Sequence, residues 1–268
     1  MVLLHGGPGL WDEFDDLAPL IDDIADVHRH DQRGGGRSER RGPYDIDTAI
    51  ADIEALRVRW GHQSWIVGGH SWGAALAIAY AVRHPERVVG LLHISGTGVI
   101  DDWHNEYHEN AAARLTPEQR ERHAALRAIV KGAPGEWNPQ LDREYCGLAW
   151  LPDFVDRDGA PALIDRLYRY GGPNYEANRA LGKDWARLLA DPAFVAGVAR
   201  IEAPVLVLHG SEDPRPAHLA ERLAASLPNA RLVIVPKAGH MPWIEQPKAV
   251  RQALRSFLAA LPAARLAV

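Results

Sequence analysis

Ser71 lies in the pattern Gly69-His70-Ser71-Trp72-Gly73, and the segments around this pattern favour a nucleophile at its centre. An apolar stretch typical of a strand precedes the pattern, and an alanine-rich stretch typical of a helix follows it. A strand that reverses sharply into a helix leaves no space for side chains at the two glycine positions. We therefore expect a strained backbone at Ser71, with its hydroxyl clear of the sheet and close to the first helix amides. A simple Gly-Ser turn at the end of a strand is the alternative.

Two later turns contain the residue types that a serine hydroxyl needs for nucleophilic attack. Asp213 follows the apolar stretch 204–208, and His240 follows the apolar stretch 230–235. An imidazole titrates near neutral pH and can take the hydroxyl proton, while a carboxylate fixes its tautomer and stabilises its charged form. Taken separately, Asp213 fits a common turn and His240 fits a surface loop. The order Ser71, Asp213, His240, each after a predicted strand, instead predicts a catalytic triad.

Strands and helices alternate on both sides of this serine, which favours a mostly parallel sheet with helices on both faces. The apolar residues of one predicted helix, 46–60, recur at helical spacing, and Asp45 or Asp47 is its expected N-cap. Strands are predicted at 1–4, 26–28, 64–68, 88–94, 204–208 and 230–235. Further helices are predicted at 14–21, after the serine as far as 84, at 217–227 and at 248–261.

Residues 98–191 break this alternation, because they contain helical periodicity but no convincing apolar strand. We interpret them as a helical lid that is inserted after the fourth strand and lies above the carboxyl edge of the sheet, over Ser71. The core is then formed by residues 1–97 and 192–268. The predicted fold class is α/β.

The overall composition is that of an ordinary globular protein, and it limits the possible partners. The 268 residues are 47% hydrophobic and 24% charged, which suits one large α/β domain or a core with one insertion. A net charge of −5 offers no basic surface for nucleic acid and no cationic face for a membrane. The single cysteine, Cys146, fits a reducing compartment, and no apolar run reaches about 18 residues. We expect a cytoplasmic protein with a small substrate; its oligomeric state is not determined at this stage.

Two glycine-rich turns and one histidine pair have weaker chemical signals. The turn at 5–9 leaves backbone amides uncovered that an anionic oxygen can use. The loop at 31–38 lacks the sequence of a phosphate cradle, so we expect an Arg–Asp pair that braces the turn. His104 and His108 have the spacing of two metal ligands, but a surface pair is favoured because no third ligand is near. No metal or cofactor is expected.

Taken together, the motifs at 5–9, 31–38, 69–73, 210–213 and 239–240 occur in a characteristic order. In this respect the chain resembles α/β-hydrolases of the proline iminopeptidase group. The resemblance implies an α/β-hydrolase fold and assigns Ser71 as nucleophile, Asp213 as orienting acid and His240 as base. The oxyanion hole that it implies consists of the backbone amides of Trp72 and Gly7, with Gly6 as their neighbour.

The resemblance also implies two features that this sequence does not match closely. The family has an antiparallel strand pair before the motif at 5–9, and a sequence that begins at Met1 does not contain this pair. Family members hold the free amino group of the substrate with lid glutamates. The candidates here are Glu106, Glu109 and Glu176, although solvated helix carboxylates are the alternative for each.

We therefore expect a cofactor-free serine hydrolase that forms an acyl-enzyme. The favoured activity is an aminopeptidase that releases N-terminal proline or a small apolar residue from short peptides. An esterase, or another hydrolase of small acyl compounds, is the alternative with the same groups. A weakly active or inactive ligand-binding homologue is the alternative of another class.

Overall fold

Six short strands, all parallel, form the central sheet in the described part of the chain. The structure is a computed structural model that describes residues 1–99, 102–132 and 138–261. The strand order is β2-β1-β3-β4-β5-β6, so the order reverses beside β1. Ligands of open parallel sheets bind at the carboxyl ends of the strands near such a reversal. The strands are β1 (Val2–Leu4), β2 (His28–Arg29), β3 (Trp65–His70), β4 (Val88–Ile94), β5 (Val205–Gly210) and β6 (Ala230–Val235).

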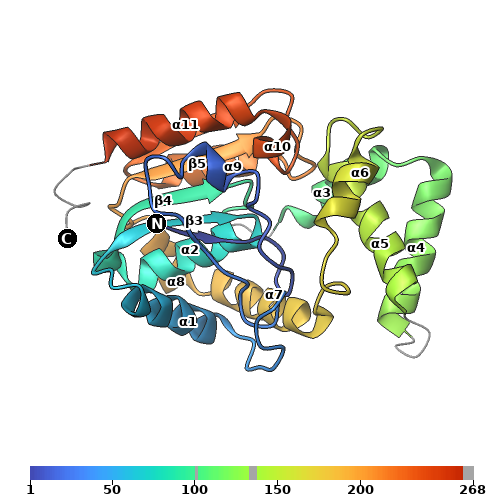
Figure 1. Ribbon diagram of the computed structural model, residues 1–268, viewed down its shortest axis with the longest axis horizontal. Coiled ribbons are helices and arrows are strands. Elements are labelled where there is room, and N and C mark those ends of the chain that lie inside the picture. The colour runs from blue at the N-terminus through green and yellow to red at the C-terminus, as the bar shows by residue number, and fades with distance from the viewer. Residues whose placement is uncertain (100–101, 133–137, 262–268) are drawn as a thin grey trace.

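Helices cover both faces of this sheet, and the central strands β3, β4 and β5 are buried along their whole length. One face packs against α1 (Ile46–Arg59), α2 (Trp72–Arg83), α8 (Pro192–Val198) and α9 (Ala217–Ser226). The other packs against α10 (Pro242–Glu245) and α11 (Pro247–Ala260). Figure 1 shows α11 on one side of the strands and α1 and α8 on the other. The predicted parallel sheet with helices on both faces is confirmed.

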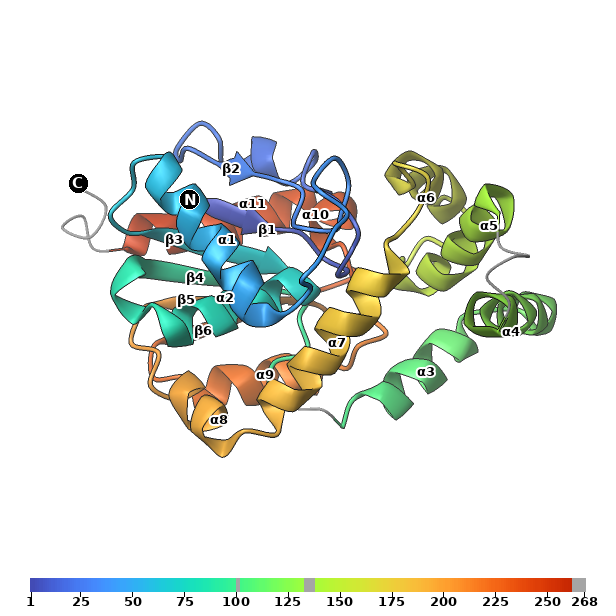
Figure 2. The ribbon, with the colours of Figure 1, turned by 90° about the horizontal axis from the view of Figure 1, so that it is seen from below.

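In its described residues, the segment between β4 and α8 contains helices joined by turns and no strand. In Figures 1 and 2, the first four of its helices stand to one side of the sheet, whereas α7 runs back beside α1 and α8. The side chains of Leu181, Trp185 and Leu188 attach α7 to the main apolar core. The helices are α3 (His104–Ala113), α4 (Pro117–Gly132), α5 (Pro139–Trp150), α6 (Ala160–Leu167) and α7 (Tyr175–Leu189).

The predicted helix at 14–21 is wrong in type, although its apolar residues are buried as expected. Only a short 3₁₀ turn forms there, at Ala18–Leu20. Pro19 lacks the amide hydrogen that a continuing α-helix needs at this position. Phe14, Leu17 and Ile21 nevertheless have no exposed surface and pack on the α11 side of the sheet. Asp45 is the N-cap of α1, since its carboxylate accepts a hydrogen bond from the amide of Thr48.

Candidate active site

The turn between β3 and α2 has the strained geometry that its sequence predicts. Ser71 has φ 53° and ψ −114°, a conformation that residues with a side chain rarely adopt. A Cβ atom on Gly69 would lie 2.0 Å from the carbonyl oxygen of Gly73, and one on Gly73 would lie 1.9 Å from that of Leu4. Both positions therefore require glycine. The turn fixes Ser71 at the carboxyl edge of the sheet, directly before the first amides of α2.

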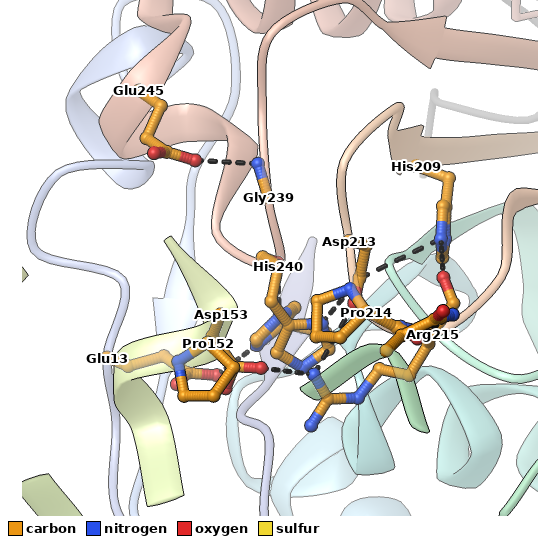
Figure 3. A network of polar contacts seen from close by, with 12 residues as sticks. Glu13, Pro152, Asp153, His209, Asp213, Pro214, Arg215, Gly239, His240 and Glu245 are labelled. Atoms are coloured by element: carbon orange, nitrogen blue, oxygen red, sulfur yellow. Dashed lines mark hydrogen bonds and ion pairs between the residues drawn. The ribbon is translucent and has the colours of Figure 1, made fainter. Parts of the chain in front are cut away.

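The predicted acid and base are in direct contact. Nδ1 of His240, in the loop after β6, lies 2.6 Å from Oδ2 of Asp213, in the loop after β5 (Figure 3). Both side chains are buried. A neutral imidazole that donates from Nδ1 to a carboxylate keeps Nε2 as an acceptor. His240 can therefore take a proton from a nucleophile on its Nε2 side.

Ser71 and His240 line the same cavity, whose volume is about 270 Å³. Its floor comes from the core and includes the glycine turn after β1. Its opposite wall comes from the helical segment and is largely aromatic. Among its lining residues are Gly6, Gly7, Trp11, Glu13 and His70 from the core, and Tyr107, Tyr145, Trp150 and Tyr175 from the helical segment.

The glycine turn after β1 and the turn of Ser71 are tied together by one glutamine. The side-chain amide of Gln32 donates to the carbonyl oxygen of His5, and the Trp72 indole donates to Oε1 of Gln32. Gly7, at φ 55°, lines the cavity. The amide of Gly6 is already used, because it donates to Oε1 of Glu13 at 2.7 Å. This contact leaves Gly7 and Trp72 as the amides to consider for an oxyanion.

Burial and nearby charges shift the pKa values of Asp213 and His240. Burial alone would raise the pKa of Asp213, but the positive charges of His240 and Arg215, with the hydrogen bond from His240, hold this pKa well below its usual value. Burial lowers the pKa of His240, and the Arg215 cation lowers it further, against the attraction of Asp213. His240 is thus kept neutral and able to accept a proton, while Asp213 stays ionised.

Several residues that shape this site had not been predicted. Arg215 contacts Asp213 at 3.4 Å and Asp153 at 2.5 Å (Figure 3). Its guanidinium also lies over the ring of Tyr107, 4.6 Å from the centroid. Its position two residues after Asp213 is a local signal that could have been noticed. Nothing in the sequence connects Asp153 with the same loop, because 62 residues separate it from Arg215.

The loop of His240 is also held by backbone contacts to the helical segment. The amide of His240 donates to the carbonyl oxygen of Asp153 at 2.7 Å. Glu245 accepts from the amides of Gly239 at 2.6 Å and Val155 at 2.7 Å, as Figure 3 shows for Gly239. The short turn after α5 is therefore bonded directly to the loop that carries the base.

The three predicted lid glutamates do not lie in this cavity. Glu106, Glu109 and Glu176 are exposed and are absent from its lining, and Glu106 lies 3.8 Å from His218 on α9. On α7, Tyr175 is the residue that reaches the cavity and Ala177 is buried. Because consecutive helix residues point about 100° apart, the intervening Glu176 is turned outward.

The loop at 31–38 is braced by an Arg–Asp pair, as predicted. Asp31 accepts hydrogen bonds from the amide and Nε of Arg37 and from the amide of Asp12. His104 and His108 lie on α3. Within the described residues, no three His, Cys, Asp or Glu side chains converge in the manner of metal ligands. None of the helices in that part of the chain combines the length and apolar character needed to cross a membrane.

Comparisons with known proteins agree with the fold. A family model described as the alpha/beta hydrolase fold matches residues 1–247. A proline iminopeptidase of Neisseria meningitidis is 30% identical over 269 aligned positions, covering 90% of this chain and 82% of the relative. One from Saccharolobus solfataricus is 27% identical, covering 96% and 84%. Among solved structures, an esterase from Thermogutta terrifontis has a TM-score of 0.71 at 24% identity, covering 96% of this chain and 88% of that one. A proline iminopeptidase from Mycobacterium smegmatis has a TM-score of 0.65 at 21% identity, with the same coverage.

Proposed function

The chain belongs to the α/β-hydrolase family, within its proline iminopeptidase group, and is a hydrolase of the serine class; we propose that Ser71, His240 and Asp213 are its catalytic triad. One observation carries this proposal. His240 donates to Asp213 at 2.6 Å while it shares a cavity with a serine on a strained turn. The remaining nitrogen of the imidazole is then free to act as a base toward that serine.

The proposed reaction proceeds through an acyl-enzyme. Oγ of Ser71 attacks the substrate carbonyl carbon, and its proton passes to Nε2 of His240. The amides of Trp72 and Gly7 stabilise the negative charge that develops on the carbonyl oxygen. The bond to the leaving amine then breaks, and His240 gives its proton to that amine. Water, deprotonated by His240, attacks the acyl carbon and breaks its ester bond to Oγ of Ser71. The acid is released, and His240 returns the proton to Oγ.

We propose an aminopeptidase activity that releases N-terminal proline or a small apolar residue from short peptides. Support comes from the relatives that are proline iminopeptidases and from the restricted cavity of about 270 Å³ beneath the helical segment. The aromatic wall formed by Tyr107, Tyr145 and Trp150 suits an apolar ring next to the scissile carbonyl. The substrates that fit are a short peptide or another small acyl compound.

The test compares prolyl arylamide, N-acetylprolyl arylamide and p-nitrophenyl acetate by kcat/KM, and reaction with a fluorophosphonate is followed by peptide mass analysis. We expect hydrolysis of prolyl arylamide, labelling at Ser71, and loss of about 10⁴-fold or more in kcat for Ser71→Ala. Turnover of the acetate ester alone would favour an esterase. Absence of labelling at Ser71 would reject the triad.

Ser95→Ala is the matched control for this experiment. Ser95 is also buried, has φ 49° and follows the neighbouring strand β4, but it is absent from the lining of the cavity. We expect Ser95→Ala to keep both turnover and labelling. Equal losses in the two variants would indicate a structural role for both serines.

A further inference from the structure

Glu13 is a buried carboxylate that contacts two of the loops around Ser71. Its Oε1 atom accepts from the amide of Gly6 at 2.7 Å and lies 2.5 Å from Nδ1 of His70, the residue before Ser71. A Cβ atom on Gly6 would lie 2.9 Å from Oε1, 2.9 Å from Nδ1 of His70 and 3.3 Å from Cβ of Ser71. Glu13 therefore lies beside the nucleophile, and it lines the cavity.

His70 extends this contact to a third loop. Its second nitrogen, Nε2, lies 3.0 Å from the carbonyl oxygen of His240. The His70 ring packs against the ring of His240, with centroids 4.5 Å apart, and against that of Trp243, at 4.7 Å. These contacts help to hold the imidazole in this orientation. One chain of contacts thus joins the turn of Gly6, the turn of Ser71 and the loop that carries the base.

The chemistry of the partners determines where hydrogens must lie. A carbonyl oxygen only accepts, so Nε2 of His70 carries a hydrogen that it donates to His240. Oε1 of Glu13 and Nδ1 of His70 are both acceptors unless a proton lies between them. The pair therefore holds one more proton than an ionised carboxylate and a neutral imidazole would hold separately. A buried cationic ring is tolerated when an anion is its partner.

We infer that Glu13, acting through His70, is a positioning residue that holds the backbone of His240 at the distance its side chain needs from Ser71. This inference rests on the proposed triad and adds a second acid–imidazole pair behind it. The charged and titratable groups that act on His240 are then Asp213, Arg215, Asp153 and His70, and His70 is in turn paired with Glu13. Neither Glu13 nor His70 takes part in proton transfer to the substrate.

The decisive variant is Glu13→Gln, which keeps the size of the side chain and one acceptor oxygen. A neutral amide cannot keep all three contacts of this carboxylate chain. If the amide oxygen accepts from Nδ1 of a neutral His70, Nε2 has no hydrogen to donate to the carbonyl of His240. If the amide nitrogen instead donates to Nδ1, the amide of Gly6 loses its acceptor. We expect kcat to fall about 100-fold with little change in KM, because a small displacement of a reacting group has this effect. Asp184→Asn is the matched control. The Asp184 carboxylate also accepts a hydrogen bond from a backbone amide, that of Ile46 at 2.8 Å, but Asp184 does not line the cavity.

A spectroscopic measurement tests the pair without any assay. With ¹⁵N-labelled histidine, the wild-type protein should show two strongly downfield imidazole N–H resonances, one from His240 on Asp213 and one from His70 on Glu13. Glu13→Gln should lose the His70 resonance and shift that of His240, whereas Asp184→Asn should change neither. The double variant Glu13→Gln/His70→Gln removes both members and should lose no more activity than Glu13→Gln alone.

The outcomes separate this inference from the proposed function. If the wild type turns over no substrate, the proposed function fails, while the resonances still report whether Glu13 and His70 share a proton and whether Glu13→Gln disturbs His240. If turnover is present but Glu13→Gln has the kcat of Asp184→Asn, the positioning role is rejected. A wild-type spectrum with only the His240 resonance would also reject it, even if Glu13→Gln did not fold.

Discussion

Arg215 and Asp153 form an ion pair, with 2.5 Å between Nη1 and Oδ1, that joins the loop after β5 to the turn after α5. Both side chains are nearly buried, and the same guanidinium reaches Asp213 at 3.4 Å. The carbonyl oxygen of Asp153 also accepts from the amide of His240. The helical segment therefore helps to place the acid and the base in addition to forming one wall of the cavity.

Replacing Arg215 with methionine should destabilise the protein strongly. The change leaves the carboxylates of Asp153 and Asp213 buried without their shared cation, and breaking a buried pair in this way typically costs about 3–5 kcal/mol. Urea denaturation measures the loss in the free energy of unfolding. The double variant Arg215→Met/Asp153→Asn should recover part of this loss in unfolding free energy. A loss below about 1 kcal/mol in Arg215→Met, as is typical of an exposed ion pair, would contradict this account.

The pH dependence of kcat/KM should show an acid limb below the ordinary histidine pKa of 6.5. Burial lowers the pKa of His240 and the Arg215 cation lowers it further, so the neutral, basic form persists as the pH falls. Removing that cation in Arg215→Met favours protonated His240 and should move the acid limb to higher pH. An acid limb that stays in place or moves to lower pH in this variant would show that Arg215 does not act on His240.

Asp213→Asn should leave the fold intact but nearly abolish turnover. A carboxamide at this position can donate to Nδ1 and so favours the imidazole tautomer with hydrogen on Nε2, which cannot take the proton of Ser71. The expected loss in kcat is about 10⁴-fold, measured on prolyl arylamide. Residual turnover within tenfold of the wild type would mean that another group orients His240.

His93→Leu should make the protein more resistant to acid. His93 is fully buried on β4, neither of its ring nitrogens has a hydrogen-bond partner among the residues that the structure describes, and burial lowers its pKa to about 3. In the unfolded chain His93 takes up a proton below pH 6.5, whereas in the folded chain it does so only near pH 3. Lowering the pH between these values therefore lowers the stability of the protein.

At pH 4.5 His93 is protonated in the unfolded chain and neutral in the folded chain. This difference lowers the free energy of unfolding by about 3 kcal/mol. Urea denaturation at pH 8 and pH 4.5 measures the difference in unfolding free energy between the two conditions. This difference should shrink by about that amount in His93→Leu. An unchanged difference would show that His93 does not contribute to acid sensitivity.

The residue pattern alone predicted the sheet, its helices and the candidate triad. Ser71, Asp213 and His240 each follow an apolar strand, and parallel strands bring their carboxyl ends to one edge. Periodicity and turn residues are local properties, so they predict element type without knowledge of the rest of the fold. Their weakest point was the segment 14–21, where the apolar spacing was correct but Pro19 prevented an α-helix.

Only the tertiary structure placed Glu13 against His70 and Asp153 against Arg215, and only it turned Glu176 away from the cavity. Periodicity indicates which face of a helix is buried, but not which loop that face meets or how far the helix is rotated about its axis. Hydrogen bonds and ion pairs form only within a few ångströms, so they depend on how distant segments pack together. That packing is a property of the whole chain and leaves no local mark in the sequence.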